Sequence, residues 1–381
     1  MWGQRNNRTD EPGAVGPELR GDMITTHRLK KPSPRSGLTW VDVIVMLIIM
    51  ALLAMLFVPT VRTAGTSARK LECLNNIRNC GLAIQNLASG SGGALPPLVT
   101  ALPISRGSKT GQLPVPWTVQ ILPAIDATSL LRSIKFNAIN TSGVTPDVVF
   151  QIAPTDVVWI QAYTCPNDLD SHRQPGGLSY VVNAGFISSE IWGTGETKSL
   201  VHQPYFFDWD RAAGRSPDGV TGTLDPLDLA TEVATGVFWR PTPTDEFVSS
   251  LDYISEGDGA ATTLMLSDNL NAGRWMDVTV NQIGFGIELK SKNGVVAPGQ
   301  LTGLAATGLL TQAPDSWMIN RPKMSLYAPR PSSAHAGGVN VILCDGSGRF
   351  LSNNIDKAVY VKLVTSNGVA FGEEELNNGS Y

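Results

Sequence analysis

A long run of apolar residues near the N-terminus dominates the hydrophobic pattern of the chain. Residues 38–58 are almost all apolar, with Asp42 as the single charged side chain. As a helix, this run would be roughly 32 Å long, enough to cross the hydrocarbon core of a bilayer. Because residues 28–35 are cationic and contain no acid, the positive-inside rule keeps them in the cytoplasm and sends the C-terminal body across. These cations are Arg28, Lys30, Lys31 and Arg35.

Beyond Pro59 the helical pattern continues but becomes amphipathic. Apolar residues recur at spacings of three and four, while charged and amide side chains occupy the other positions. We therefore expect the helix to leave the membrane and lie against a sheet, until the Gly- and Ser-rich residues 89–93 end it. The apolar face predicted from this spacing comprises Val61, Ala64, Ala68, Leu71, Leu74, Ile77, Gly81, Ile84 and Leu87.

Two other interpretations of the apolar run are open. A buried helix of a soluble protein would not need the basic flank, and it would be expected to show a polar face. A cleaved secretory signal peptide has an apolar region of about 7–15 residues that ends in small residues. The run here is longer and passes directly into further helix, which favours a retained membrane anchor.

The rest of the chain has short apolar runs separated by turn residues. It contains 38 Gly and 25 Pro among 381 residues, which favours many turns and short strands. We expect an α+β fold, in which the long N-terminal helix packs on an antiparallel β-sheet elaborated by a large inserted region. The expected division is a cytoplasmic leader (1–37), a transmembrane and amphipathic helix (38–88) and an extracytoplasmic α+β domain (89–381).

Charge and motifs exclude several classes of function. Lys and Arg total 29 against 33 Asp and Glu, so no electrostatic footprint for nucleic acid is expected. The chain has no G-x-S-x-G, H-E-x-x-H, phosphate-binding or dinucleotide motif, and its four His residues are far apart. We expect no enzymatic activity and no cofactor. Acids near position 250 leave an envelope hydrolase as a weaker alternative, and a Trp-lined pocket would indicate a binding module.

Four cysteines are too few for a disulfide scaffold in a chain of this length. Cys73 and Cys80 would lie roughly 10 Å apart along one helix, so they cannot bond to each other. An oxidised pair would instead join this helix to the body, with Cys165 as the best partner. Cys344 lies in an apolar run that predicts a buried thiol.

A hairpin is predicted near the C-terminus. Residues 339–344 form an apolar strand, residues 345–348 a turn, and residues 349–351 the start of a return strand. Asp345 can accept a hydrogen bond from the turn backbone and Gly346 can adopt a positive φ.

His335 precedes the first strand of this hairpin, and we interpret His335 and Asp345 as a side-chain clamp that holds it. A metal site is the alternative, but one His and one Asp do not make a ligand set. Calcium would need further oxygen ligands, such as Asp356 or Glu373. We therefore expect no metal.

The segment around residue 38 resembles the leader of type IV prepilins and pseudopilins, whose pattern is Gly-Phe-Thr-Leu-Ile-Glu. The resemblance implies that the expected α+β fold is pilin-like, that a prepilin peptidase cuts between Gly37 and Leu38, and that the new amine is methylated. It also implies that the Asp42 carboxylate pairs with the terminal amine of a neighbouring subunit. Leu38 replaces the usual Phe, and Asp42 replaces the usual Glu and is one methylene shorter. In the alternative, Asp42 only reaches the lipid headgroups. The matching residues are Gly37-Leu38-Thr39-Trp40-Val41-Asp42, followed by the apolar run to Pro59.

The rest of the chain resembles a large planctomycete family of prepilin-like proteins with a conserved domain of unknown function, sometimes filed with extracellular solute-binding proteins. In that family's pattern Cys73 and Cys165 correspond to cysteines, which implies a Cys73–Cys165 disulfide in an oxidising compartment. The matching pieces, in family order, are residues 68–77, Trp117 with Leu122-Pro123, residues 163–166, residues 179–181, residues 257–267, and His335 followed after nine residues by Asp345-Gly346.

Together these features predict a single-pass, membrane-anchored structural subunit that resembles a pseudopilin and displays its domain outside the cytoplasm. It would belong to the cell envelope or to a pilus- or secretion-type apparatus. The expected partners are the membrane, the prepilin peptidase, and further copies or other pilin-like subunits, with no nucleic acid. The alternative is an anchored surface module that binds a solute or glycan.

Overall fold

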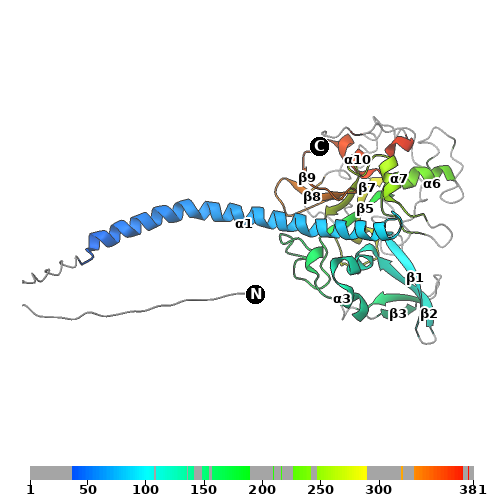
Figure 1. The fold of residues 1–381 in the computed structure, drawn as a ribbon, viewed down its shortest axis with the longest axis horizontal. Helices are drawn as coiled ribbons and strands as arrows, with labels where there is room; N and C mark the ends of the chain where they lie inside the picture. Colours follow the sequence, from blue (N-terminus) through cyan, green and yellow to red (C-terminus); the bar gives the residue numbers. More distant parts are fainter. Residues whose placement is uncertain are drawn as a thin grey trace, which may run out of the picture. The chain divides into compact units, whose positions relative to one another are not determined.

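The computed structural model describes residues 37–106, 109–134, 136–140, 148–153, 157–188, 209, 216, 226–241, 247–289, 319–320, 330–371 and 376 (Figure 1). The chain divides into an N-terminal unit that ends at Thr60 and a domain that begins at Val61. Helix α1 (Trp40–Gly90) contributes to both units. The predicted leader lies outside the described residues, except for Gly37.

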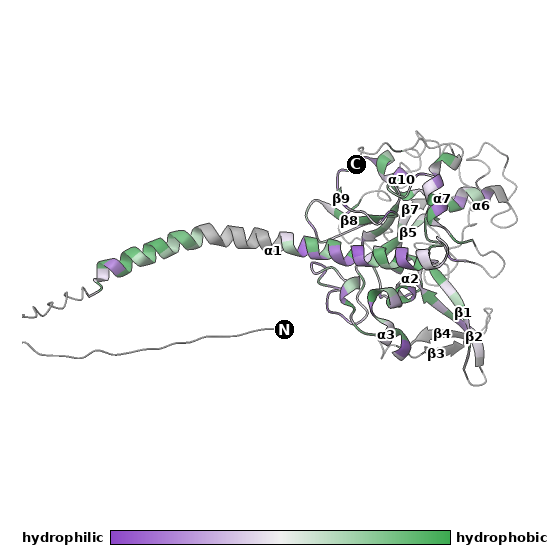
Figure 2. Cartoon of the chain, viewed as in Figure 1, coloured by the Kyte–Doolittle hydropathy of each residue, from purple (hydrophilic) through white to green (hydrophobic). Residues whose placement is uncertain are grey.

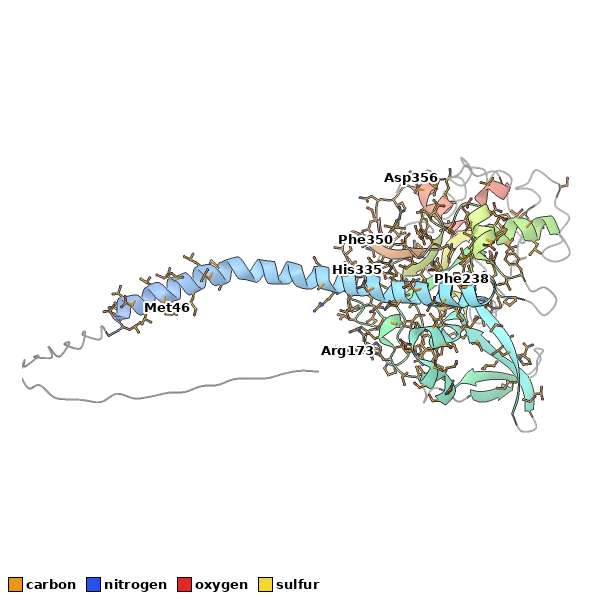
Figure 3. All side chains as sticks on the ribbon, viewed as in Figure 1. Met46, Arg173, Phe238, His335, Phe350 and Asp356 are labelled. Atoms are coloured by element: carbon orange, nitrogen blue, oxygen red, sulfur yellow. The ribbon has the colours of Figure 1, made fainter. Side chains whose placement is uncertain are left out.

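The first part of α1 is apolar on every side. Its described side chains from Leu38 to Met55 are exposed, including Leu38 at 78 %, Trp40 at 76 % and Met46 at 63 %. Figure 2 shows this stretch as hydrophobic around its whole circumference after the first turn, and Figure 3 shows Met46 pointing away from the helix axis. Among the helices that can be described, none has an apolar stretch of the length that a bilayer crossing requires.

The C-terminal part of α1 is amphipathic, as the spacing predicts. Cys73, Ile77, Cys80 and Ile84 are fully buried and recur at intervals of three and four residues. Ala68 and Leu71 of the predicted face are exceptions, since both are exposed, Leu71 at 61 %. The buried face is therefore rotated around the helix relative to the predicted face, and it includes the small residues Cys73, Cys80 and Ala83. These small side chains let the helix lie close to the sheet.

A five-stranded sheet forms the centre of the domain, in the order β7-β5-β6-β8-β9. β5 pairs with β6, β6 with β8, and β8 with β9, all antiparallel, whereas β5 and β7 are parallel. The α+β class is confirmed, but the sheet is mixed rather than purely antiparallel. The cause is the return of the chain after β6 through α8 (Val280–Ile283) to the far edge of β5. The strands are β5 (Tyr180–Ser188), β6 (Leu264–Asp268), β7 (Gly284–Leu289), β8 (Gly338–Leu343) and β9 (Gly348–Ser352).

The two faces of this sheet have separate hydrophobic cores. β8 shows the alternation, since Ile342 joins the core that contains α1, while Val341 and Leu343 join the other core. Helix α10 (Lys357–Val364) contributes Tyr360 and its neighbours to the second core. Because successive strand residues face opposite sides, β8 packs between α1 and α10. The helix covers its face closely: a Cβ at Gly81 would lie 2.9 Å from Cγ2 of Ile342.

A second sheet lies in the sequence between α1 and β5 and belongs to the expected inserted region. Its order is β1-β2-β4-β3, with β2 and β4 parallel. Trp117 links this region to the domain centre, because its Nε1 donates to the carbonyl of Ile283 at 3.0 Å. The elements are β1 (Val99–Arg106), β2 (Lys109–Pro116), α2 (Trp117–Gln120), η1 (Leu122–Ile125), α3 (Thr128–Ser133), β3 (Phe136–Asn140) and β4 (Val148–Ile152). The remaining described helices are η3 (Gln161–Tyr163), α6 (Pro226–Val233), α7 (Leu251–Glu256) and η5 (Gly368–Phe371).

Candidate functional site

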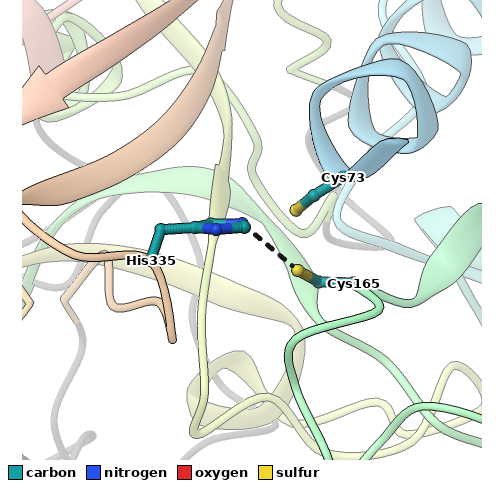
Figure 4. A group of neighbouring side chains, drawn as sticks. All are labelled: Cys73, Cys165 and His335. Carbon is teal, nitrogen blue, oxygen red and sulfur yellow. Dashed lines mark hydrogen bonds between the residues drawn. The ribbon is translucent and has the colours of Figure 1, made fainter. Parts of the chain in front are cut away.

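Three residues from distant parts of the chain meet in the interior of the domain. Cys73 lies on α1, Cys165 follows η3, and His335 lies in the loop before β8. The two sulfur atoms and one imidazole nitrogen lie within 4.8 Å of one another. Figure 4 shows the three side chains converging. All are buried, with Cys73 at 0 %, Cys165 at 3 % and His335 at 5 % exposure. We call this group the Cys-Cys-His cluster.

The imidazole of His335 is held at both nitrogens. Nε2 lies 3.3 Å from Sγ of Cys165, and Nδ2 of Asn167 lies 3.2 Å from Nδ1. With the Asn167 amide donating to Nδ1, the proton of a neutral imidazole resides on Nε2 and points at Cys165. The backbone N–H of His335 donates to Oγ of Ser333 at 3.0 Å, which fixes the loop itself.

Cys73 has its own set of polar neighbours. Its thiol donates to Oδ1 of Asp268 at 3.4 Å, while the Tyr180 hydroxyl and the Asn340 amide each approach Sγ at 3.4 Å. Asp268 is 2 % exposed, and its Oδ2 accepts from the backbone N–H of Asn340 at 2.8 Å. A carboxyl group is thus oriented beside the cluster as a fourth polar member.

The loop that carries Cys165 is also fixed by hydrogen bonds. The Cys165 N–H donates to Oγ of Ser179 at 3.0 Å, and that hydroxyl donates to Oδ2 of Asp168 at 2.7 Å. A small pocket opens beside Cys165 and Asp268, lined also by Ser179 and Ser332 among others. Hydrogen bonds therefore hold the loop in place, and the small pocket lies beside the cluster.

The proton affinities of the four groups are shifted by their proximity. The adjacent Cys73 thiol lowers the pKa of Cys165 most, burial opposes this effect, and the bond from His335 lowers the pKa further, so the net shift is downward. Burial, then the neighbouring Cys165, raises the pKa of Cys73. Burial raises the pKa of Asp268 to about 7, with the charge on Cys165 adding to the effect. Burial works to lower the pKa of His335, but Cys165 outweighs it and the net shift is upward. The contact between the two cysteines therefore shifts their pKa values in opposite directions, downward for Cys165 and upward for Cys73.

The structure brings together the two cysteines that the family resemblance pairs. Cys73 and Cys165 are neighbours, but both thiols are free, so the disulfide stays a prediction. Cys80 and Cys344 are also free and buried, and Cys344 is the buried thiol predicted from its apolar run. Two thiols, an imidazole and a carboxyl in one place can bind a metal ion, and the two thiols alone can form a disulfide.

The hairpin is confirmed, and His335 and Asp345 lie at opposite ends of its first strand. β8 and β9 pair from Gly338 opposite Ser352, and the turn between them has Gly346 at φ 81°. Asp345 Oδ1 accepts from the N–H of Ser347 at 2.8 Å, within its own turn. His335 instead contacts Cys165 and Asn167 at the other end of the strand. The intervening strand separates the two residues, so each stabilises a different end of β8.

The calcium alternative loses one of its two extra ligands. Asp356 caps α10, because its Oδ1 accepts from the N–H groups of Ala358 and Val359 at 2.8 and 3.3 Å; Figure 3 labels this residue. Glu373 lies outside the described residues. The Cys-Cys-His cluster was not predicted as a ligand set. Its only sequence signal is that all three members fall on family motifs, since their separation hides any ligand spacing.

The processing and assembly residues lie at the start of α1. Gly37 and Leu38 precede the helix. Asp42 Oδ2 accepts from the Thr39 N–H at 2.9 Å and from its hydroxyl at 2.7 Å. Thr39 Oγ1 lies 3.4 Å from the Asp42 N–H, which completes a reciprocal capping arrangement. The spacing Thr-x-x-Asp is the signal for this cap, which was not among the expectations for Asp42.

The fold and the site define a class of protein. Its members would have an α+β domain that buries two cysteines and a histidine beside a long N-terminal helix. The chain belongs to the family described as "Protein of unknown function (DUF1559)", whose family model matches residues 62–358. This confirms the resemblance to a conserved domain of unknown function. The label of the family model loosely files it with solute-binding proteins. Neither the comparison with curated proteins nor the comparison with solved structures gives a match.

Proposed function

We propose that this protein is a pseudopilin-like structural subunit that is anchored in a membrane by the start of α1 and displays its domain outside the cytoplasm. One observation carries the proposal: a single helix has exposed apolar side chains in its first part and a buried face in its last part. The first part would lie in the membrane, and the last part packs into the core of the domain.

The apolar part of α1 needs an apolar environment. Its exposed side chains surround the helix, so one contact with a protein surface could not cover them all. Placing such side chains in lipid is favourable, in proportion to the apolar area removed from water. The four cations in residues 28–35 would remain on the cytoplasmic side, which would leave the C-terminal domain on the other side.

The structure at the start of the helix is compatible with prepilin-type cleavage of this anchor. Gly37 and Leu38 lie just outside α1, so a peptidase at the membrane surface could reach the bond between them. The Thr39–Asp42 cap satisfies backbone groups at the end of the helix that would enter the lipid. Cleavage would leave Leu38 as the mature N-terminus, one turn before the carboxylate of Asp42.

Membrane fractionation of a charged variant tests the anchor. We expect the double variant Ile48→Lys and Leu52→Lys to leave the membrane fraction, since each cation at the centre of a span costs roughly 2.5–3.5 kcal/mol. Leu71→Lys with Leu82→Lys is the matched control. Both leucines are exposed positions of α1 within the domain, at 61 % and 44 %.

The two double variants add the same charge, so only its place on α1 differs. In wild type and in the control, the domain should be cut by protease added outside intact cells. Equal release of both double variants from the membrane would contradict the proposal.

A solute- or glycan-binding module is the second candidate, favoured by the label of the family model. Of the domain tryptophans that the structure describes, Trp117, Trp209, Trp239 and Trp275 are buried and serve packing. Trp159 is half-buried, and its Nε1 donates to Oγ1 of Thr164 at 2.9 Å. The small pocket beside Cys165 has mostly polar and small lining residues. A rise in melting temperature with a panel of sugars and amino acids would favour this candidate.

A further inference from the structure

We propose that Cys73, Cys165 and His335 bind a zinc ion, with Asp268 as the fourth ligand. This would be a structural metal site that ties α1 to the loop after η3 and to the loop before β8. The proposal goes beyond the anchoring function and does not depend on it, because all four residues lie within the domain.

The spacing of the three ligand atoms in the Cys-Cys-His cluster suits tetrahedral coordination, and Asp268 adjoins the cluster through Cys73. Zinc lies about 2.3 Å from thiolate sulfur and about 2.0–2.2 Å from imidazole nitrogen or carboxylate oxygen, so neighbouring ligand atoms lie about 3.5 Å apart. Sγ of Cys165 lies 3.3 Å from Nε2 of His335, and Sγ of Cys73 lies 3.4 Å from Oδ1 of Asp268. The ligand atoms of the Cys-Cys-His cluster are all within 4.8 Å of one another. Small side-chain adjustments would complete the shell.

The ligand types select the class of metal. Two thiolates with an imidazole favour zinc or copper(I) over the hard cations calcium and magnesium, which prefer oxygen. Four protein ligands in a buried place are typical of a structural zinc site, which leaves no position open for a substrate. Zinc would also neutralise the negative charge that two thiolates and a carboxylate bring into the interior.

A second shell of hydrogen bonds is already in place. The Tyr180 hydroxyl and the Asn340 amide approach Sγ of Cys73, and the Asn340 backbone N–H orients Asp268. Zinc on Nε2 of His335 requires the proton on Nδ1, where the Asn167 amide lies at 3.2 Å. Rotating that amide by half a turn places its oxygen there as the acceptor, without changing its shape. Cys73, Asp268 and His335 each thus have a partner outside the proposed ligand set.

Two other uses of these residues explain less of the site. A Cys73–Cys165 disulfide would explain why the two sulfur atoms lie close together, but it would not explain why His335 and Asp268 lie beside them. Its sulfurs would have to approach to about 2.05 Å. A nucleophilic Cys165 would need access for a substrate, whereas Cys165 is 3 % exposed. Zinc and the disulfide exclude each other in one molecule, because the disulfide removes both thiolates.

Metal analysis of the purified full chain tests the proposal. We expect zinc equimolar with protein in the wild type, and its loss in Cys73→Ser, Cys165→Ser and His335→Ala. Cys80→Ser is the matched control, since Cys80 is also a fully buried free thiol on α1, hydrogen-bonded to the carbonyl of Ala162 at 3.2 Å. The control should retain zinc. Equimolar copper with the same dependence on the variants would support the site and correct the metal.

A second measurement avoids variants that fail to fold. Replacing the metal of the wild type with cobalt(II) should produce the thiolate-to-metal charge-transfer absorption and the intense visible bands of a tetrahedral thiolate site. The proposal is overturned if reduced wild type takes up neither zinc nor cobalt, or if peptide mapping recovers Cys73 and Cys165 joined as a disulfide in the purified protein. Retention of zinc by Cys73→Ser and Cys165→Ser alike would also overturn it.

Discussion

At the residue scale, the two ends of β8 are stabilised by different means. Before the strand, His335 contacts Cys165 and Asn167, which belong to a distant loop. After the strand, Gly346 has φ 81°, and a Cβ there would lie 2.7 Å from Oε1 of Gln85. Nε2 of Gln85 donates to the carbonyl of Cys344 at 2.9 Å. Glycine at this position therefore lets α1 bond to the hairpin turn.

Gly346→Ala should lower the free energy of unfolding by about 1–3 kcal/mol, because it strains a left-handed backbone and displaces Gln85. Gly337→Ala is the control, since Gly337 has φ 87° but a Cβ there would meet no atom within 4 Å. Chemical denaturation of both variants would separate the two effects. Equal losses would show that the contact with Gln85 contributes nothing.

The roles of Asp345 and Gly346 in the turn after β8 could be predicted from the sequence, but the Cys-Cys-His cluster could not. Asp345 and Gly346 act within four residues of chain, so their sequence alone indicates the turn. Cys165 and His335 are 170 residues apart, and only the packing of three elements brings them to Cys73. No spacing rule connects residues at such separations.

At the element scale, α1 is the part that the hydrophobic pattern predicts best. A change from uniform to periodic apolar residues is a local property, and the buried face with Ile77 and Ile84 confirms it. The parallel pairing of β5 and β7 could not be predicted, because it depends on how the chain returns after β6. The exposed Leu71 shows the same limit, since the exact face is set by the close approach to the sheet.

Asp42 connects the start of this helix with assembly. We expect Asp42→Ala to lower the crosslinked yield of the protein in membranes, whereas Asp42→Glu should retain it, because the proposed partner is the terminal amine of a neighbouring subunit. Thr39→Ala is the matched control. It removes the hydroxyl bonds of the cap but keeps the carboxylate, so it should crosslink like the wild type.

Two outcomes would contradict this expectation. Equal yields in the wild type and all three variants would mean that Asp42 has no role in assembly and that the protein is a monomeric anchored domain. A loss in Thr39→Ala as large as in Asp42→Ala would assign the effect to the helix cap instead.

At the scale of the whole molecule, we assign separate tasks to the two units. The unit that ends at Thr60 carries the proposed anchor, and the domain from Val61 onward contains both sheets and the Cys-Cys-His cluster. The family match spans residues 62–358 and therefore covers most of the domain but not the proposed anchor. The sequence that the domain shares with its family is thus separate from the sequence that would place the protein in a membrane.

Mass spectrometry of the mature N-terminus, on protein extracted from its native membrane, tests the central claim most directly. We expect a mature chain that begins at Leu38 with a methylated amine. Gly37→Leu should yield an uncut precursor that is still in the membrane, because its anchor is unchanged. Recovery of intact peptides spanning residues 35–41 from the mature wild-type protein would contradict prepilin-type processing.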